Sequence, residues 1–376
     1  MMTFGLVLTG IVLLMALYVT RRVMAVIPPQ RPWLRRAFAA AVIGASALFI
    51  MSRLLGRGHG SGWPVAFGQA GYFTMILLFH CACCLLVVDF VTGFGFWCKR
   101  LVPRLRLAAL LAACALSLIA LGQGHRAPVV ESYEVAVPGL PAELDGKVVV
   151  ALSDLHFGET LGEEWLAGVI GQVTELQPDM VVLLGDIFEG HGNPSPDELA
   201  DFRRLRPPLG MWAVIGNHDS RHDELYNSLA GDTTLRVLTN EWHELRPGFV
   251  LVGIEEDNAH RGIGNTPELL AKELRERPPG ATMLLIHSPR LVEHAADAGV
   301  ELMLCGHTHG GQVWPFSYAA QGIYRYLAGR YAVKNTTVIV SRGAGTWGPR
   351  MRLWQRGEIS RIVLRAPATA STRLAD

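Results

Sequence analysis

The stretch that decides the fold is Leu-Met-Leu-Cys-Gly-His-Thr-His-Gly-Gly-Gln at residues 302–312. It opens with a short apolar run, and we predict a buried strand over residues 301–304. His307 and His309 follow two positions apart, so both side chains lie on the same side if this segment is extended. The glycines around them let the backbone turn sharply. The stretch therefore predicts a strand that presents two imidazoles at its carboxyl end.

The same arrangement occurs four more times earlier in the chain. An apolar, β-branched run predicts a strand, and polar side chains suited to metal binding follow it directly. The runs are 147–152 before Asp154 and His156, 180–184 before Asp186, 211–215 before Asn217, His218 and Asp219, and 282–286 before His287. Ligands of open α/β sheets bind at the carboxyl ends of the strands. We therefore expect these side chains to meet at one edge.

Helical segments alternate with these strands. Residues 163–177, 196–204 and 267–277 are predicted helices, and the last two begin with proline or Thr-Pro. Further strands are expected at 249–253, 338–340 and 359–364. Alternating strands and helices followed by a strand-rich end indicate an α/β sandwich. Residues 366–376 are small and polar, and we expect a disordered tail.

The side chains at the strand ends suit a pair of divalent ions. Imidazole, carboxylate and amide ligands without a thiolate fit Mn, Fe or Zn as catalytic ions better than a structural zinc. Two such ions about 3.5–4 Å apart can hold both oxygens of an in-line phosphoryl displacement. They need a bridging carboxylate, which Asp186 can supply.

The motifs DLH, GD, GNHD, H and GHTH, in this order, resemble the calcineurin-like metallophosphoesterase superfamily over roughly residues 129–365. GHTHGGQVWP and SRGAGTWGPRMRL, the latter at 341–353, are similar to its bacterial membrane-associated branch. That branch includes phosphodiesterases and proteins likened to UDP-diacylglucosamine pyrophosphohydrolases. The resemblance implies a four-layer α/β/β/α sandwich at residues 127–365.

The resemblance also implies roles for individual residues. One ion would be held by Asp154, His156, Asp186 and His309, and the other by Asp186, Asn217, His287 and His307. A hydroxide bridging the ions would attack phosphorus. His218 would act as general acid or stabilise the leaving oxygen, and Asp219 would orient His218 or cap the next helix. The family often has Asp three residues after the bridging Asp, whereas this chain has Glu189.

The first third of the chain differs sharply in charge. Residues 1–126 carry twelve Lys or Arg and one acid, Asp89, whereas residues 127–376 carry twenty-two basic and thirty-two acidic residues. This break predicts a domain boundary near residue 126. The net charge of −10 on the second part argues against nucleic-acid binding, which needs basic surface.

Four uncharged stretches predict an anchor of four transmembrane helices, at about 1–20, 37–52, 63–88 and 107–124. The second is short, but flanking arginines could snorkel at its ends. The segments 21–36 and 99–106 hold five and four basic residues, so they should be cytoplasmic. Residues 125–376 would then lie on the outer, periplasmic side of the inner membrane.

Some features in the first third have a plain structural interpretation. Cys81, Cys83 and Cys84 have apolar neighbours, which favours packing over a metal or redox site. His80 is expected to be a packed or hydrogen-bonded histidine, and Asp89 a solvated helix end.

The substrate follows less directly from the sequence. The anchor favours a phosphodiester or pyrophosphate in a phospholipid or a lipid-linked nucleotide. A phosphomonoesterase and a non-catalytic binding or sensor module are the alternatives. Arg342 and Arg350 are candidates for contact with a substrate phosphate.

Overall fold

The computed structural model describes residues 2–55, 63–158, 160–189, 201–219, 235–255 and 266–367. It divides into two compact units. The first comprises residues 1–125 and the segment 348–354, and the second comprises residues 126–347 and 355–376. The predicted tail from residue 368 onward and the predicted helix at 196–204, up to residue 200, lie outside the described residues.

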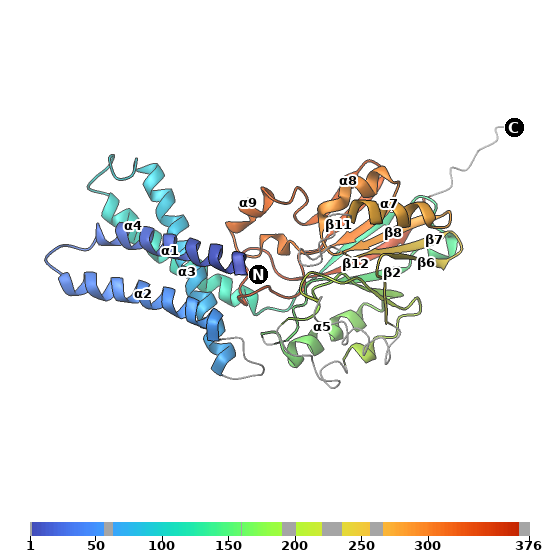
Figure 1. Cartoon of the computed structure of the whole chain (residues 1–376), viewed down its shortest axis with the longest axis horizontal. Coiled ribbons are helices and arrows are strands. Elements are labelled where there is room, and N and C mark those ends of the chain that lie inside the picture. Colours follow the sequence, from blue (N-terminus) through green and yellow to red (C-terminus); the bar gives the residue numbers. More distant parts are fainter. Residues whose placement is uncertain are drawn as a thin grey trace. The chain divides into compact units, whose positions relative to one another are not determined.

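Long apolar helices make up most of the first unit. They are α1 (Met2–Met24), α2 (Pro32–Leu55), α3 (Trp63–Val91) and α4 (Val102–Gly124) (Figure 1). All four are long and apolar enough to cross a membrane. Helix α2 begins five residues before the predicted span. The prediction used the uncharged stretch only, and that stretch leaves out Arg35 and Arg36, which lie in the first turns of the helix. The second predicted span is therefore longer than its uncharged core.

Asp89 is buried rather than solvated, contrary to the expectation from its place at a helix end. Its carboxylate accepts a hydrogen bond from Tyr18 (2.6 Å) and pairs with Arg22 (2.5 Å) and Arg106 (3.0 Å). These contacts join α1, α3 and α4, so the charge of Asp89 is neutralised inside the bundle. His80 is buried as expected, with Nδ1 2.8 Å from Ser117 Oγ.

The segment 348–354 follows the second unit in sequence but clusters with the helices. The backbone N–H groups of Arg350 and Trp354 donate to the side chains of Gln69 (3.1 Å) and Gln123 (2.8 Å). The continuous domain expected over 127–365 is therefore interrupted here, and Arg350 belongs to the first unit.

The strands of the second unit form two six-stranded sheets within the described residues. The first has the order β1-β12-β2-β3-β4-β5, and the second has the order β10-β11-β9-β8-β7-β6. The first sheet contains β1 (Val129–Ala136), β2 (Val148–Leu152), β3 (Met180–Leu183), β4 (Met211–Ala213), β5 (Leu235–Val237) and β12 (Glu358–Arg365). The second contains β6 (Glu241–Arg246), β7 (Phe249–Ile254), β8 (Ala281–Ile286), β9 (Leu302–Cys305), β10 (Gly329–Val333) and β11 (Thr336–Val340).

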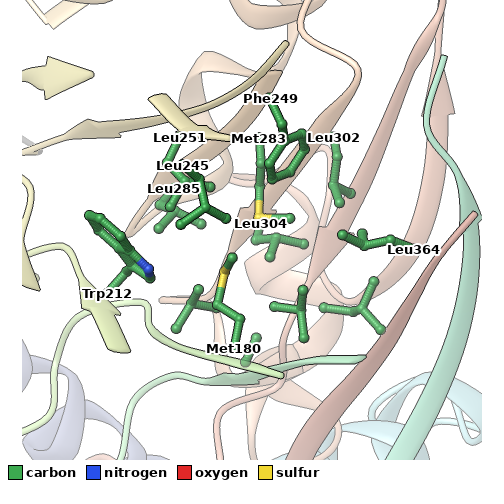
Figure 2. Packing of buried hydrophobic residues seen from close by; sticks show 14 of the residues in the cluster. Met180, Trp212, Leu245, Phe249, Leu251, Met283, Leu285, Leu302, Leu304 and Leu364 are labelled. Carbon is green, nitrogen blue, oxygen red and sulfur yellow. The ribbon is translucent and has the colours of Figure 1, made fainter. Parts of the chain in front are cut away.

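The alternation of side chains along the strands produces the layers. In β2, Val149 and Ala151 pack between the two sheets, whereas Val150 and Leu152 pack against α5 (Glu163–Glu175). The core between the sheets is apolar from both sides: Met180 and Trp212 face Leu251, Met283 and Leu285 (Figure 2). Burying such side chains stabilises the fold by about 1.5–3 kcal/mol each.

Helices cover the outer faces of both sheets (Figure 1). Helix α5 packs on the first sheet, and α7 (Thr266–Glu276) and α8 (Val292–Asp297) pack on the second. The order of layers is therefore helix, sheet, sheet, helix. This confirms the predicted α/β/β/α sandwich.

Candidate metal centre

The predicted ligands follow strands of both sheets at their carboxyl ends. Within the first sheet, β2, β3 and β4 are parallel neighbours, and within the second, β8 and β9 are. Parallel neighbours end at the same edge, so the loops after them bring their polar side chains together. Six of the seven predicted ligands lie in two compact groups there.

The first group comprises Asp154, His156 and His309. The Nε2 atoms of the two histidines are 3.2 Å apart, and His309 Nε2 lies 3.4 Å from Asp154 Oδ1. All three residues are buried. This group matches three of the four ligands expected for one ion.

The second group comprises Asp186, His287 and His307. His287 Nε2 lies 3.2 Å from Asp186 Oδ2 and 3.0 Å from His307 Nδ1. The same Asp186 Oδ2 is 3.9 Å from His156 Nε2 in the first group. Asp186 therefore lies where a carboxylate could bridge ions held by the two groups.

Asn217 is the seventh predicted ligand, and it lies in the turn after β4 with its side chain exposed. The backbone N–H of its neighbour His218 donates to Asp186 Oδ1 at 2.8 Å. The turn that carries Asn217 is thus tied to the bridging carboxylate.

The backbone at the ligands is unusual. Asp154, His156, Asp186, His307 and His309 all have positive φ, between 45° and 70°. Side chains other than glycine rarely adopt this left-handed region, and each such residue costs about 1–3 kcal/mol. Strain of this kind at five of the seven predicted ligands indicates that the fold favours ligand placement over local stability.

Two glycines keep space for the carboxylates. A Cβ at Gly216 would lie 2.3 Å from Asp186 Oδ1, and a Cβ at Gly306 would lie 2.5 Å from Asp154 Oδ2. Neither distance is possible for real atoms. Glycine at these two positions is therefore required by close approach to the ligands.

Glu189 connects a predicted ligand with the predicted acid. Its Oε2 lies 2.5 Å from His156 Nδ1 and 3.2 Å from His218 Nδ1. Burial would raise the pKa of Glu189, but its hydrogen bonds with both histidines hold it well below the usual range. The carboxylate found in place of the family's more frequent Asp therefore reaches both rings.

Glu189 also controls the charge of His218. Burial alone would lower the pKa of His218, but the hydrogen bond to Glu189 and the charges of Asp186 and Glu189 raise it to about 9. The opposite holds for His307, where burial and the charge of His287 lower the pKa to about 4. A neutral His307 suits a metal ligand, and a protonated His218 suits a proton donor.

Asp219 has a different set of partners from the expected one. Its Oδ1 accepts hydrogen bonds from the backbone N–H groups of Ile187 and Phe188, and its Oδ2 from those of Asp186 and Gly216. The carboxylate therefore fixes the loop that carries Asp186 to the loop that carries Asn217. Its position assigns it to loop structure, and the contact that orients His218 comes from Glu189.

The two groups fit divalent ions. Asp154 Oδ1 is buried and has no hydrogen-bond partner among the described residues, although it faces His309. A buried carboxylate oxygen without a partner costs free energy, which a cation would recover. Six residues with nitrogen or oxygen donors, the bridging carboxylate of Asp186 among them and no thiolate, are the donor set of a catalytic rather than a structural centre.

Comparison with known proteins agrees with this geometry. The family described as Calcineurin-like phosphoesterase matches residues 147–311. A metallophosphoesterase of Aquifex aeolicus is 33% identical over 239 residues, which cover 60% of this chain and 87% of that protein. The chain belongs to the calcineurin-like phosphoesterase family. The resemblance expected from the five motifs is thereby confirmed.

One relative of the chain is named as a transmembrane protein. A transmembrane protein with a metallophosphoesterase domain from Bos taurus is 31% identical over 284 residues, covering 71% of this chain and 64% of that protein. A metallophosphoesterase of Campylobacter jejuni is 30% identical over 239 residues, covering 62% of each. The chain thus spans just under two-thirds of the length of these two relatives. Together with the four apolar helices, the transmembrane relative from Bos taurus indicates a membrane protein with a metallophosphoesterase domain.

Arg342, a candidate for contact with a substrate phosphate, pairs with two carboxylates. Its Nη2 lies 2.6 Å from Glu131 Oε1, and its Nε lies 2.9 Å from Glu358 Oε2. The guanidinium therefore ties the loop after β11 to β1 and β12. The pairing makes Arg342 part of the scaffold.

Tyr324 is a site residue that the motifs did not indicate. Its hydroxyl lies 2.8 Å from His307 Nε2 and accepts a hydrogen bond from Arg290 at 3.2 Å. His307 Nδ1 faces His287 and the second group, so Nε2 is left for Tyr324. An outer partner of this kind fixes the orientation and tautomer of a metal-binding imidazole.

Tyr324→Phe should therefore weaken metal binding by about 10–100-fold at one of the two groups while the other keeps its affinity. The ring stays, and only the hydroxyl is lost. Isothermal titration of the metal-free chain with Mn²⁺ measures both affinities. Tyr318→Phe, which removes an exposed hydroxyl from α9 (Phe316–Gln321), is the matched control. Unchanged affinities in Tyr324→Phe would show that the hydroxyl does not position His307.

Proposed function

We propose that this chain is a membrane-anchored phosphoesterase that uses two divalent ions, Mn, Fe or Zn, to hydrolyse a phosphodiester or pyrophosphate bond. The observation that carries the proposal is the meeting of two three-residue groups at Asp186, beside a histidine held by a carboxylate. One group without the other could hold only a single ion.

The ions would be held by Asp154, His156 and His309 on one side and by Asp186, His287 and His307 on the other, with Asn217 expected as a further ligand. When bound, they would supply electrophilic stabilisation of the phosphoryl oxygens and activate water. The phosphorus gains a bond to the water oxygen and loses its bond to the leaving oxygen. A phosphodiester would give an alcohol and a phosphomonoester, and a pyrophosphate that links two organic groups would give two phosphomonoesters.

His218 would complete this step by donating a proton to the leaving oxygen. Glu189 holds the ring through Nδ1, which leaves Nε2 as the nitrogen for that transfer. The raised pKa of His218 supports the role, because the ring is protonated near neutral pH. Trp347, whose ring centre lies 6.2 Å from that of His218, borders the same space.

A selectivity assay tests this function. The detergent-solubilised full chain, loaded with Mn²⁺, is expected to hydrolyse bis-p-nitrophenyl phosphate with a higher kcat/KM than p-nitrophenyl phosphate. The reason is that the ions and His218 would act on the leaving oxygen, and this does not require the second negative charge that a phosphomonoester carries. A preference for the monoester would establish a phosphomonoesterase instead. Absence of turnover with both esters and with a pyrophosphate-linked dinucleotide would support a binding or sensor module.

The location of the domain is part of the proposal. The excess of basic residues in 21–36 and 99–106 supports a cytoplasmic location for these segments, and hence a phosphoesterase domain on the outer side of the inner membrane. A reporter enzyme fused after Asp376 that is active only in the cytoplasm would contradict this orientation.

A further inference from the structure

Exposed apolar side chains of the second unit concentrate in one short segment. The large hydrophobic residues with the greatest exposed fractions in its described part are Phe316 (51%), Tyr318 (66%) and Ile323 (70%). We call these three residues the apolar rim. Three large exposed apolar groups within eight residues exceed the scattered single ones that are normal on a protein surface.

Helix α9 presents the reverse of the usual amphipathic pattern. Ala320 is its buried residue, whereas Phe316 and Tyr318 point outward. A helix on a soluble domain normally buries its large apolar side chains and exposes small or polar ones. Here the buried residue is the small Ala320, whereas Phe316 and Tyr318 are exposed, so core packing does not explain these two large side chains.

The segment with the rim begins at the metal centre. Gly311 follows the ligand His309 by two residues, and a Cβ at Gly311 would lie 2.4 Å from Ser317 Cα. The backbone N–H of Phe316 also donates to Val313 O at 2.9 Å. The start of α9 is therefore packed directly against the turn that carries His309.

The same segment ends at the metal centre. Ile323 is followed by Tyr324, whose hydroxyl lies 2.8 Å from His307 Nε2. The rim is thus fixed beside the proposed reaction site at both ends. Arg290, which donates to Tyr324, adds a positive charge at this inner end.

The chemistry of the segment matches a lipid with a phosphate group. Residues 310–323 contain no Asp, Glu, Lys or Arg, so no charge opposes contact with acyl chains. Aromatic and branched aliphatic side chains are those that enter the boundary of a bilayer. A lipid is apolar along its acyl chains and negatively charged at its phosphate. The protein changes in the matching order, from the apolar rim to the cation of Arg290 and the metal centre.

The anchor tethers the second unit to the membrane that would hold such a lipid. Helix α4 ends at Gly124, and β1 begins at Val129. Five residues span at most about 18 Å when fully extended. The second unit therefore starts close to the end of a helix that is apolar and long enough to cross the membrane.

We infer that the apolar rim binds the acyl chains of a membrane lipid whose phosphodiester or pyrophosphate enters the metal centre. The inference rests on the proposed function and names its substrate class. Phe316, Tyr318 and Ile323 are specificity residues in this account, and they do not take part in the bond-breaking step.

The test replaces all three rim residues by serine in the full chain, solubilised in detergent. Phe316→Leu, Tyr318→Phe and Ile323→Leu together form the control, because they keep the positions apolar. The substrates are a long-chain phosphatidyl ester of p-nitrophenol and water-soluble bis-p-nitrophenyl phosphate. The serine variant is expected to lose about tenfold or more in kcat/KM on the lipid through a higher KM, and to keep the soluble activity within about twofold. The control should retain both activities.

A binding measurement separates this inference from the proposed function. Dihexadecyl phosphate should raise the melting temperature of the wild type more than diethyl phosphate does, and the serine variant should lose that difference. This result would support lipid binding even if no ester were hydrolysed. Equal loss on both substrates, unchanged lipid turnover and binding, or a change only in oligomeric mass would each overturn the inference, the last by indicating contact between two copies of the chain.

Discussion

Asp186→Asn is expected to lower kcat/KM for bis-p-nitrophenyl phosphate by at least about 10³-fold, well beyond the 10–100-fold typical of an outer-shell contact. Asp186 is buried and lies between the two groups, with Oδ2 3.2 Å from His287 and 3.9 Å from His156. The asparagine has nearly the same shape but no negative charge, so it cannot bridge two cations. Both metal affinities should fall together.

The fold of this variant should persist. Asparagine keeps an oxygen that can accept from the His218 N–H, as Asp186 Oδ1 does. The metal-free variant should therefore melt within a few degrees of the metal-free wild type. Asp201→Asn, in a surface ion pair with Arg204, is the matched control and should keep full activity. Wild-type turnover in Asp186→Asn would exclude a bridging role for this carboxylate.

His218→Ala should produce the second large effect, a loss of about 10²–10⁴-fold on a diester with an alkyl leaving group. The physical reason is that an alkoxide needs a proton as it leaves. p-Nitrophenolate leaves readily without one, so the loss on bis-p-nitrophenyl phosphate should be much smaller. A series of aryl and alkyl methylphosphate esters would measure this dependence on the leaving group.

Glu189 should act through His218 in the same series. Glu189→Gln keeps the size of the side chain but removes the charge that raises the pKa of His218. It should lose about 10–100-fold on the alkyl ester, and Glu189→Asp should recover part of that loss.

An equal loss on aryl and alkyl esters in His218→Ala would show that His218 binds substrate rather than donating a proton.

The positions of the predicted ligands could be inferred from the sequence because each one follows a buried strand. Residues such as Asp154 and His287 could be placed from the strand before them, and the sheet brought them to one edge. The partners of Glu189 and Asp219 could not be predicted this way. A carboxylate can reach several groups from a loop, and only the folded loops decide that Glu189 meets His218 while Asp219 meets backbone N–H groups.

Tyr324 and the rim were missed for a related reason. Tyr324 lies in an irregular segment after α9, where neither strand nor helix periodicity gives a direction for its side chain. The four strands at the sheet edges, β1, β5, β6 and β10, were missed because they are partly exposed and lack continuous apolar runs. The buried strands β2, β8 and β9 were predicted to within one residue, since their apolar runs are continuous.

The most direct test of the two-ion account is a titration of the metal-free full chain with Mn²⁺ that records bound metal and turnover of bis-p-nitrophenyl phosphate together. The groups around His309 and His287 share Asp186, so both ions should be needed for hydrolysis. Turnover should stay low while the first equivalent binds and rise as the second equivalent fills. Full turnover at one equivalent, or turnover in the presence of excess chelator, would contradict the account.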